Sequence, residues 1–124
     1  MRVYWALTEE QLSTLAGGDA VTLEGQSAIS VTEGFAQTVE SSDQDELDLL
    51  AALSALDVND NCGVIAALDA EGEIVDDALG EVAFSAVVAL NDLGCFLIAD
   101  IDSDELSWFG IQEIDEVLTT VRKK

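Results

Sequence analysis

Residues 43–75 read DQDELDLLAALSALDVNDNCGVIAALDAEGEIV, and this stretch decides the class of fold. Its first part predicts a helix over residues 44–56, because five leucines between positions 47 and 56 form a wide apolar face. Ser41 or Ser42 is the predicted N-cap, and the acids of the first turns suit the positive end of the helix dipole. A polar turn at 57–61 then precedes an apolar run at 63–68, which predicts a buried strand.

The same stretch ends in a second turn signal. Residues 69–72 predict a hairpin turn that leads into a further strand at 74–75. A helix followed directly by paired strands indicates an α+β arrangement.

Towards the N-terminus, residues 2–6 are rich in β-branched and aromatic side chains and predict a first strand. Thr8 and Gln11 have the spacing of a capping box, so a short helix is expected after this strand, ending at Gly17 and Gly18. Two separate strands are predicted at 21–23 and 27–32, and the pattern over 34–39 favours no element.

Towards the C-terminus, residues 81–90 are apolar almost throughout. Such a run fits either a strand covered on both faces or a short buried helix, and periodicity does not separate the two. A strand is predicted at 95–101, a short strand or turn at 106–109, and a closing helix from Ile111 to Val121. Acids at the start of this helix and bases at its end match the helix dipole.

Together these elements predict a single acidic α+β domain over residues 1–124. We expect a mixed or mostly antiparallel sheet with two or three helices packed on one face, and a ferredoxin-like arrangement is one form of this fold. A chain of 124 residues buries enough surface for a core without disulfide or metal support.

The charge of the chain restricts its partners. The net charge is −22, from 26 acids and 4 bases, and no base occurs between Val3 and Val121. A surface of this kind repels polyanions, so we expect no direct binding of nucleic acid, membranes or phosphates. It also predicts strong self-repulsion at low salt, and hence a melting temperature that rises with added salt.

The two cysteines, Cys62 and Cys95, are expected to be free and buried, and a disulfide would require the fold to bring them together. The sequence has no signal-peptide pattern and no stretch of 18 apolar residues. These features favour a cytoplasmic protein.

Both ends of the chain carry a family signature. The opening residues Met1-Arg2-Val3-Tyr4 and the run 104–114, DELSWFGIQEI, resemble an uncharacterised family of small acidic proteins from high-GC Gram-positive bacteria. Members of that family open with Met-Arg-Val-Tyr and carry Glu-Leu-x-Trp-Tyr near the end. This chain departs from the pattern, because it has no proline after the first strand and Asp104 where histidine is usual. The resemblance implies no catalytic residue and no cofactor.

The residues available for chemistry are few. The chain has no histidine and no interior lysine, which excludes imidazole-based catalysis, Schiff-base lysines and P-loop lysines. Asp100, Asp102 and Asp104 resemble the start of a calcium loop, but the sixth and twelfth positions lack the required Gly and Glu. These three acids are therefore weak metal candidates, and a solvated acidic loop is favoured. The pattern 57–61 fails in the same way, and pairs such as Asp76-Asp77 arise readily among 26 acids.

Trp108 and Phe109 form a candidate aromatic anchor for a protein partner, with packing of the last helix as the other interpretation. We therefore favour a non-enzymatic binding or regulatory protein whose partner has a basic surface. The alternatives are a DNA mimic that inhibits a DNA-binding protein, an enzyme using carboxylates and a divalent metal, and an acidic coat that serves solubility or high-salt adaptation. Neither the partner nor the oligomeric state follows from the sequence.

Overall fold

The computed structural model describes residues 1–40, 42–99 and 106–122. Within these ranges one antiparallel sheet has the strand order β4-β5-β2-β1-β3-β6-β7. The strands are β1 (Arg2–Leu7), β2 (Val21–Ile29), β3 (Val64–Asp69), β4 (Gly72–Asp76), β5 (Glu81–Val88), β6 (Leu93–Ala99) and β7 (Leu106–Phe109). The helices are α1 (Glu9–Ala16), α2 (Glu33–Val39), α3 (Gln44–Ala55) and α4 (Ile114–Arg122), with short 3-10 turns at Leu90–Asp92 and Ile111–Glu113. The predicted α+β class with an antiparallel sheet is confirmed.

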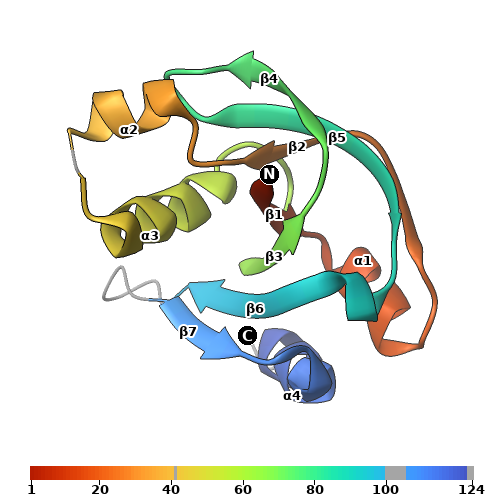
Figure 1. The fold of residues 1–124 in the computed structure, drawn as a ribbon. Helices are drawn as coiled ribbons and strands as arrows, with labels where there is room; N and C mark the ends of the chain where they lie inside the picture. The colour runs from red at the N-terminus through yellow and green to blue at the C-terminus, as the bar shows by residue number, and fades with distance from the viewer. Residues whose placement is uncertain (41, 100–105, 123–124) are drawn as a thin grey trace.

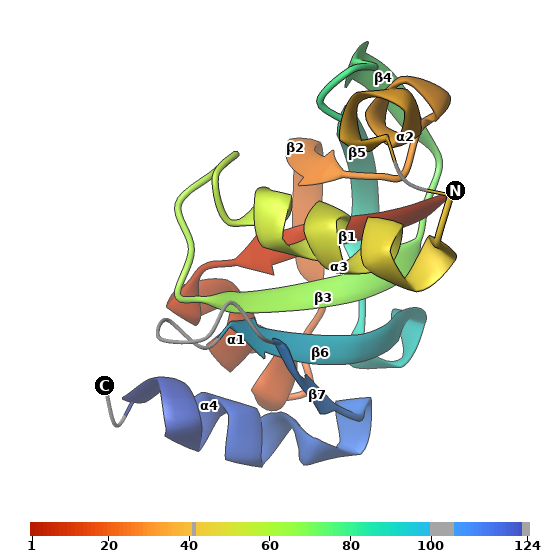
Figure 2. The ribbon, with the colours of Figure 1, turned by 90° about the vertical axis from the view of Figure 1, so that its left-hand side faces the viewer.

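The helices cover both faces of the sheet, so the prediction that they pack on one face is wrong. Successive side chains of β1 alternate between two cores: Trp5 belongs to the core under α1 and α4, and Tyr4 to the core under α2 and α3. Figures 1 and 2 show α3 on one side of the central strands and α1 and α4 on the other. The seven-strand order and this three-layer arrangement also differ from a ferredoxin-like fold. The physical reason is that β1 and β3 are apolar on both faces and need cover on both.

The sheet bends strongly between β1 and β2. These strands are in register only at Tyr4 and Ile29, and β2 is irregular between Leu23 and Gln26. Figure 1 shows β5 curving around the molecule beyond this point. The bend folds the outer strands over the core, so that the Trp5 and Phe84 rings meet edge to face with centroids 6.5 Å apart.

The predicted hairpin at 69–72 does not form. β3 ends beside the N-terminus, where Ala70 exchanges backbone hydrogen bonds with Met1 at 2.8 and 3.0 Å. The chain then leaves the interior of the sheet and reaches one of its edges, where β4 pairs with β5. A turn signal in the sequence marks the change of direction but does not specify which strand the next segment pairs with.

Several local predictions are confirmed. Thr8 and Gln11 form the capping box of α1, with hydrogen bonds of 2.9 and 3.1 Å, and Gly17 is its C-cap. Residues 81–88 form a strand rather than a helix, and residues 106–109 form the edge strand β7. The closing helix α4 begins at Ile114, after the 3-10 turn. The predicted strand 95–101 corresponds to β6, and its residues 100–101 lie outside the described ranges.

Other local predictions need correction. The N-cap of α3 is Asp43, whose carboxylate accepts from the Asp45 N–H at 3.0 Å, rather than Ser42; Ser41 lies outside the described residues. The two strands expected at 21–23 and 27–32 are one strand, β2, which has a bulge between Leu23 and Gln26 and ends at Ile29, so residues 30–32 are not part of it. Residues 33–39, which favoured no element, form α2, with Thr32 as its N-cap. No helix within the described residues is long and apolar enough to cross a lipid bilayer.

Candidate functional site

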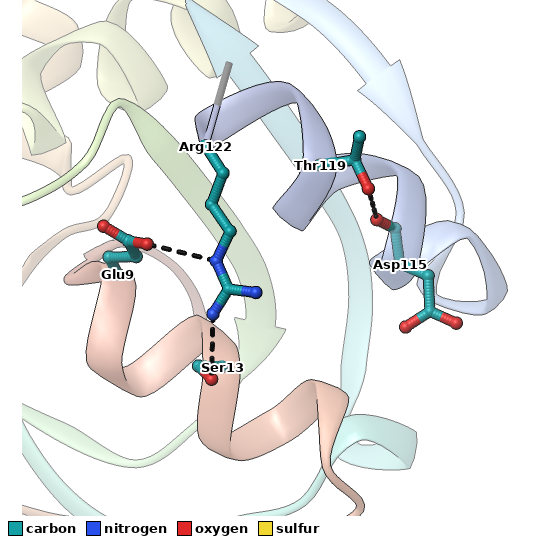
Figure 3. Close-up of polar contacts among 5 residues, drawn as sticks. All are labelled: Glu9, Ser13, Asp115, Thr119 and Arg122. Carbon is teal, nitrogen blue, oxygen red and sulfur yellow. Dashed lines mark hydrogen bonds and ion pairs between the residues drawn. The ribbon is translucent and has the colours of Figure 1, made fainter. Parts of the chain in front are cut away.

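Among the described residues, ion pairs between carboxylates and cationic side chains are rare. Across the described ranges, the structure contains one ion pair, between Arg122 of α4 and Glu9 of α1, with Nε and Oε1 3.2 Å apart. Figure 3 shows this pair beside Ser13, whose Oγ accepts from Arg122 Nη2 at 3.5 Å. Both charged side chains are about half exposed (55% and 54%), so the pair contributes little to stability. This pair therefore neutralises only a small part of the negative charge of the described residues.

The structure separates the two aromatic residues predicted as an anchor. Trp108 lies opposite Leu97 in the β6–β7 ladder and is 64% exposed. Phe109 belongs to the opposite face of β7, is half-buried and packs against the core beneath α4. Of the pair, Trp108 is placed where a partner could contact it, and Phe109 is placed as a packing residue.

Trp108 borders a shallow hollow of about 270 Å³ between α3 and the β1–β3–β6–β7 part of the sheet. We call this the Trp108 hollow. A second hollow of about 270 Å³ continues from it toward the N-terminus and shares Arg2, Tyr4 and Asp48. The residues lining the Trp108 hollow combine an apolar wall with three polar groups: Arg2, Tyr4, Asp48, Leu49, Cys95, Leu97, Leu106 and Trp108.

Tyr4 and Arg2 form the polar centre of this hollow. The guanidinium carbon of Arg2 lies 5.9 Å from the centre of the Tyr4 ring, a cation–π contact. Burial raises the pKa of the Tyr4 phenol above its ordinary value, and the Asp48 carboxylate acts in the same direction, whereas Arg2 opposes it. The phenol is therefore neutral at physiological pH.

A larger hollow lies on the same face of the sheet but beside α2, and sequence reasoning missed it. Its volume is about 480 Å³, within the range of ligand clefts. We call this the α2 groove. Its lining comes from α2, the end of β2, the end of α3 with the following loop, and the β4–β5 turn: Ile29, Phe35, Thr38, Val39, Ser54, Asp57, Val58, Ala78, Leu79 and Glu81. These segments are distant in sequence, so no local pattern signals the groove.

The predicted metal candidates Asp100, Asp102 and Asp104 lie outside the described residues. Among the residues that are described, no group of three or more His, Cys, Asp or Glu side chains could hold a metal ion. The structure gives the polar turn 57–61 a structural role, because Asn59 Nδ2 donates to the Ala6 carbonyl at 2.8 Å and Asn61 Nδ2 to the Leu56 carbonyl at 2.8 Å.

The Asp76–Asp77 pair also serves the backbone. An Asp76 oxygen accepts from the Leu79 N–H at 3.2 Å, and an Asp77 oxygen accepts from the Gly34 N–H at 3.3 Å. The two carboxylates therefore bind different segments and do not face one another across a reaction site.

Cys62 and Cys95 do not form a disulfide with each other. Cys62 packs against the core under α1 and α4, whereas Cys95 belongs to the core under α2 and α3. Cys95 pairs with Ala67, and Cys62 lies five positions before Ala67, so about five residues of extended chain separate the two cysteines, or roughly 16 Å. This exceeds the reach of a disulfide.

No protein-family model matches this chain, and no curated protein or solved structure is similar to it. The resemblance of the two chain ends to the uncharacterised family of small acidic proteins therefore stays a prediction.

Proposed function

We propose that this chain is a non-enzymatic binding or regulatory protein that acts through contact with a protein of basic surface. One observation carries the proposal: an exposed tryptophan borders a hollow on a surface whose carboxylates have almost no cationic partners within the described ranges. Exposed aromatic side chains beside pockets are typical centres of protein interfaces, and uncompensated charge steers a partner of opposite sign.

The charge supports a protein partner rather than a nucleic acid or a membrane. A net charge of −22 repels phosphate-bearing surfaces and attracts lysine- and arginine-rich ones. The lack of histidine and of interior lysine supports a role without catalysis. Cys62 and Cys95 lie against different cores and form no disulfide with each other, which supports a reducing compartment, and the proposal places the protein in the cytoplasm.

The proposal is tested by affinity capture from the native host, followed by binding measurements with each purified candidate. Trp108→Ala is the informative variant, because it removes the exposed indole at the hollow. Val87→Ala is the matched control: Val87 is also strongly exposed (67%), but it lies on β5 and lines neither hollow. We expect Trp108→Ala to weaken binding by about 30-fold, the loss typical of a central interface residue.

Salt and DNA provide the second readout. Binding should weaken as sodium chloride rises, because the attraction is electrostatic and becomes screened. Competition by duplex DNA for the captured partner distinguishes a DNA-binding protein from other basic proteins. A partner without a basic surface, or equal affinities for the Trp108→Ala and Val87→Ala proteins, would contradict the proposal.

A further inference from the structure

The α2 groove has walls that are held in place by short contacts. The Thr32 hydroxyl, at the start of α2, donates to the Asp77 carbonyl at 2.7 Å, and the Ser30 N–H donates to the Gly80 carbonyl at 2.9 Å. Gly34 permits the close approach, because a Cβ there would lie 2.4 Å from an Asp77 carboxylate oxygen. These contacts fix α2 against the β4–β5 turn, so the groove exists before any ligand arrives.

The floor and lip of the groove are apolar. Ile29 and Phe35 are buried at its base, and Val39 and Val58 are partly buried around it. Leu79 stands at the lip with 58% of its surface exposed. A partner that covers Leu79 would bury apolar surface against side chains that are already packed in the groove.

The charge around this apolar floor has one sign. Asp57 and Glu81 line the groove, Asp76 ends β4, and Asp77 belongs to the same β4–β5 turn as Leu79. No lysine or arginine lines the groove within the described ranges: Arg2 lies at the Trp108 hollow, and Arg122 lies beside α1. The occupant that complements these features carries apolar side chains next to positive charge.

We propose that the α2 groove binds a short segment of another protein in which a large aliphatic side chain is flanked by lysine or arginine. The aliphatic side chain would cover Leu79 and the groove floor, and the flanking cations would lie near Asp57 and Glu81. A second copy of this chain is a poor occupant, because two molecules of net charge −22 repel one another. The inference rests on the basic partner of the proposed function but uses a site separate from Trp108.

The test uses the intact chain and synthetic peptides. The probe peptide carries leucines flanked by lysines, and two counterparts replace the lysines with glutamates or with serines. Binding is followed by calorimetry and by amide chemical shifts in the ¹⁵N-labelled protein. We expect the lysine peptide to shift the amides of Val58 and Leu79 while leaving the Trp108 indole N–H unchanged.

Variants then assign the binding to the groove. Leu79→Asn should weaken the lysine peptide by about five- to tenfold, because half of a leucine surface no longer becomes buried. Asp57→Asn and Glu81→Gln should each weaken it by about two- to fivefold, as expected for exposed ion pairs. Val87→Asn is the control, since Val87 is exposed but lies outside the groove, and it should change nothing.

The outcomes separate this inference from the proposed function. Equal binding of the lysine, serine and glutamate peptides, or shifts centred on Trp108 instead of Leu79, would overturn the groove assignment and leave the Trp108 proposal standing. Groove binding together with a native partner that lacks a basic surface would overturn the proposed function and leave the groove's peptide preference standing. Concentration-dependent dimerisation that the Leu79→Asn variant abolishes would identify a second copy as the occupant and overturn the inference.

Discussion

Gly80 is the residue whose replacement should most directly disturb the α2 groove. It is buried, its φ is +72°, and a Cβ built on it would lie 2.5 Å from the Ser30 carbonyl oxygen and 3.2 Å from the Phe35 ring. Alanine at this position therefore meets two separate penalties. One comes from the left-handed backbone, and the other from the displacement of the β4–β5 turn away from α2.

Gly18 separates these penalties, because its φ is +89° but a Cβ there has no neighbour within 4 Å. Gly18→Ala should cost about 1–2 kcal/mol from the backbone alone. Gly80→Ala should cost the same amount plus about 1–3 kcal/mol for overpacking. For a chain of 124 residues, 1 kcal/mol corresponds to about 4 °C in melting temperature. We therefore expect Tm to fall by about 4–8 °C for Gly18→Ala and about 8–20 °C for Gly80→Ala.

Thermal unfolding followed by circular dichroism measures both variants, in one buffer of fixed and moderate salt so that charge repulsion is constant. The lysine peptide provides a second assay below the melting transition, where Gly80→Ala should bind more weakly than Gly18→Ala. Equal melting temperatures for the two variants would refute the reasoning, because the contact between the turn and α2 would then carry no steric cost.

Three further predictions follow from charge and burial. The melting temperature should rise between 10 mM and 1 M sodium chloride, because the Debye length shrinks from about 30 Å to about 3 Å and screens the repulsion between carboxylates. A melting temperature that does not change with salt would contradict this repulsion. Trp108→Phe should remove nearly all tryptophan fluorescence that acrylamide can quench, since the remaining Trp5 has no exposed surface; strong residual quenching would contradict the burial of Trp5. Ultraviolet titration of Tyr4, the one tyrosine of the chain, should give a midpoint above 10, because burial raises its pKa. The folded phenol resists ionisation, so its stabilising effect is complete below pH 10 and is lost as the pH rises through the folded pKa; a midpoint at or below 10 would refute this.

The elements that the sequence predicts correctly are those specified by local chemistry. The Thr8–Gln11 capping box requires only residues within one turn, and the dipole-matched closing helix requires only its own charges. β4 pairs instead with β5, the next strand along the chain, and the turn at 69–72 contains no information about which neighbour β4 pairs with. The choice of strand partner is therefore the point at which the sequence-based topology was wrong.

The placement of helices on both faces did have a sequence signal. Residues 3–7 and 64–68 are apolar without alternation, and such runs indicate strands covered on both sides.

The candidate site also has one part that the sequence could predict and one part that it could not. Exposure of Trp108 and burial of Phe109 follow from the alternation of an edge strand, once the strand is known to form. The α2 groove required the fold itself, because Phe35, Val58 and Leu79 meet only in three dimensions.

The positions of the apolar side chains help to separate a binding role from a coat that serves only solubility. A coat of carboxylates improves solubility wherever it lies, and it gives no reason for large apolar side chains to stay exposed. Trp108 and Leu79 are both exposed, and each borders a hollow rather than standing alone on a convex surface. Apolar surface beside hollows, surrounded by charge of one sign, is the arrangement that a basic, partly apolar partner complements. Solubility accounts for the charge alone, whereas the proposed docking role would account for both the charge and the exposure of Trp108 and Leu79.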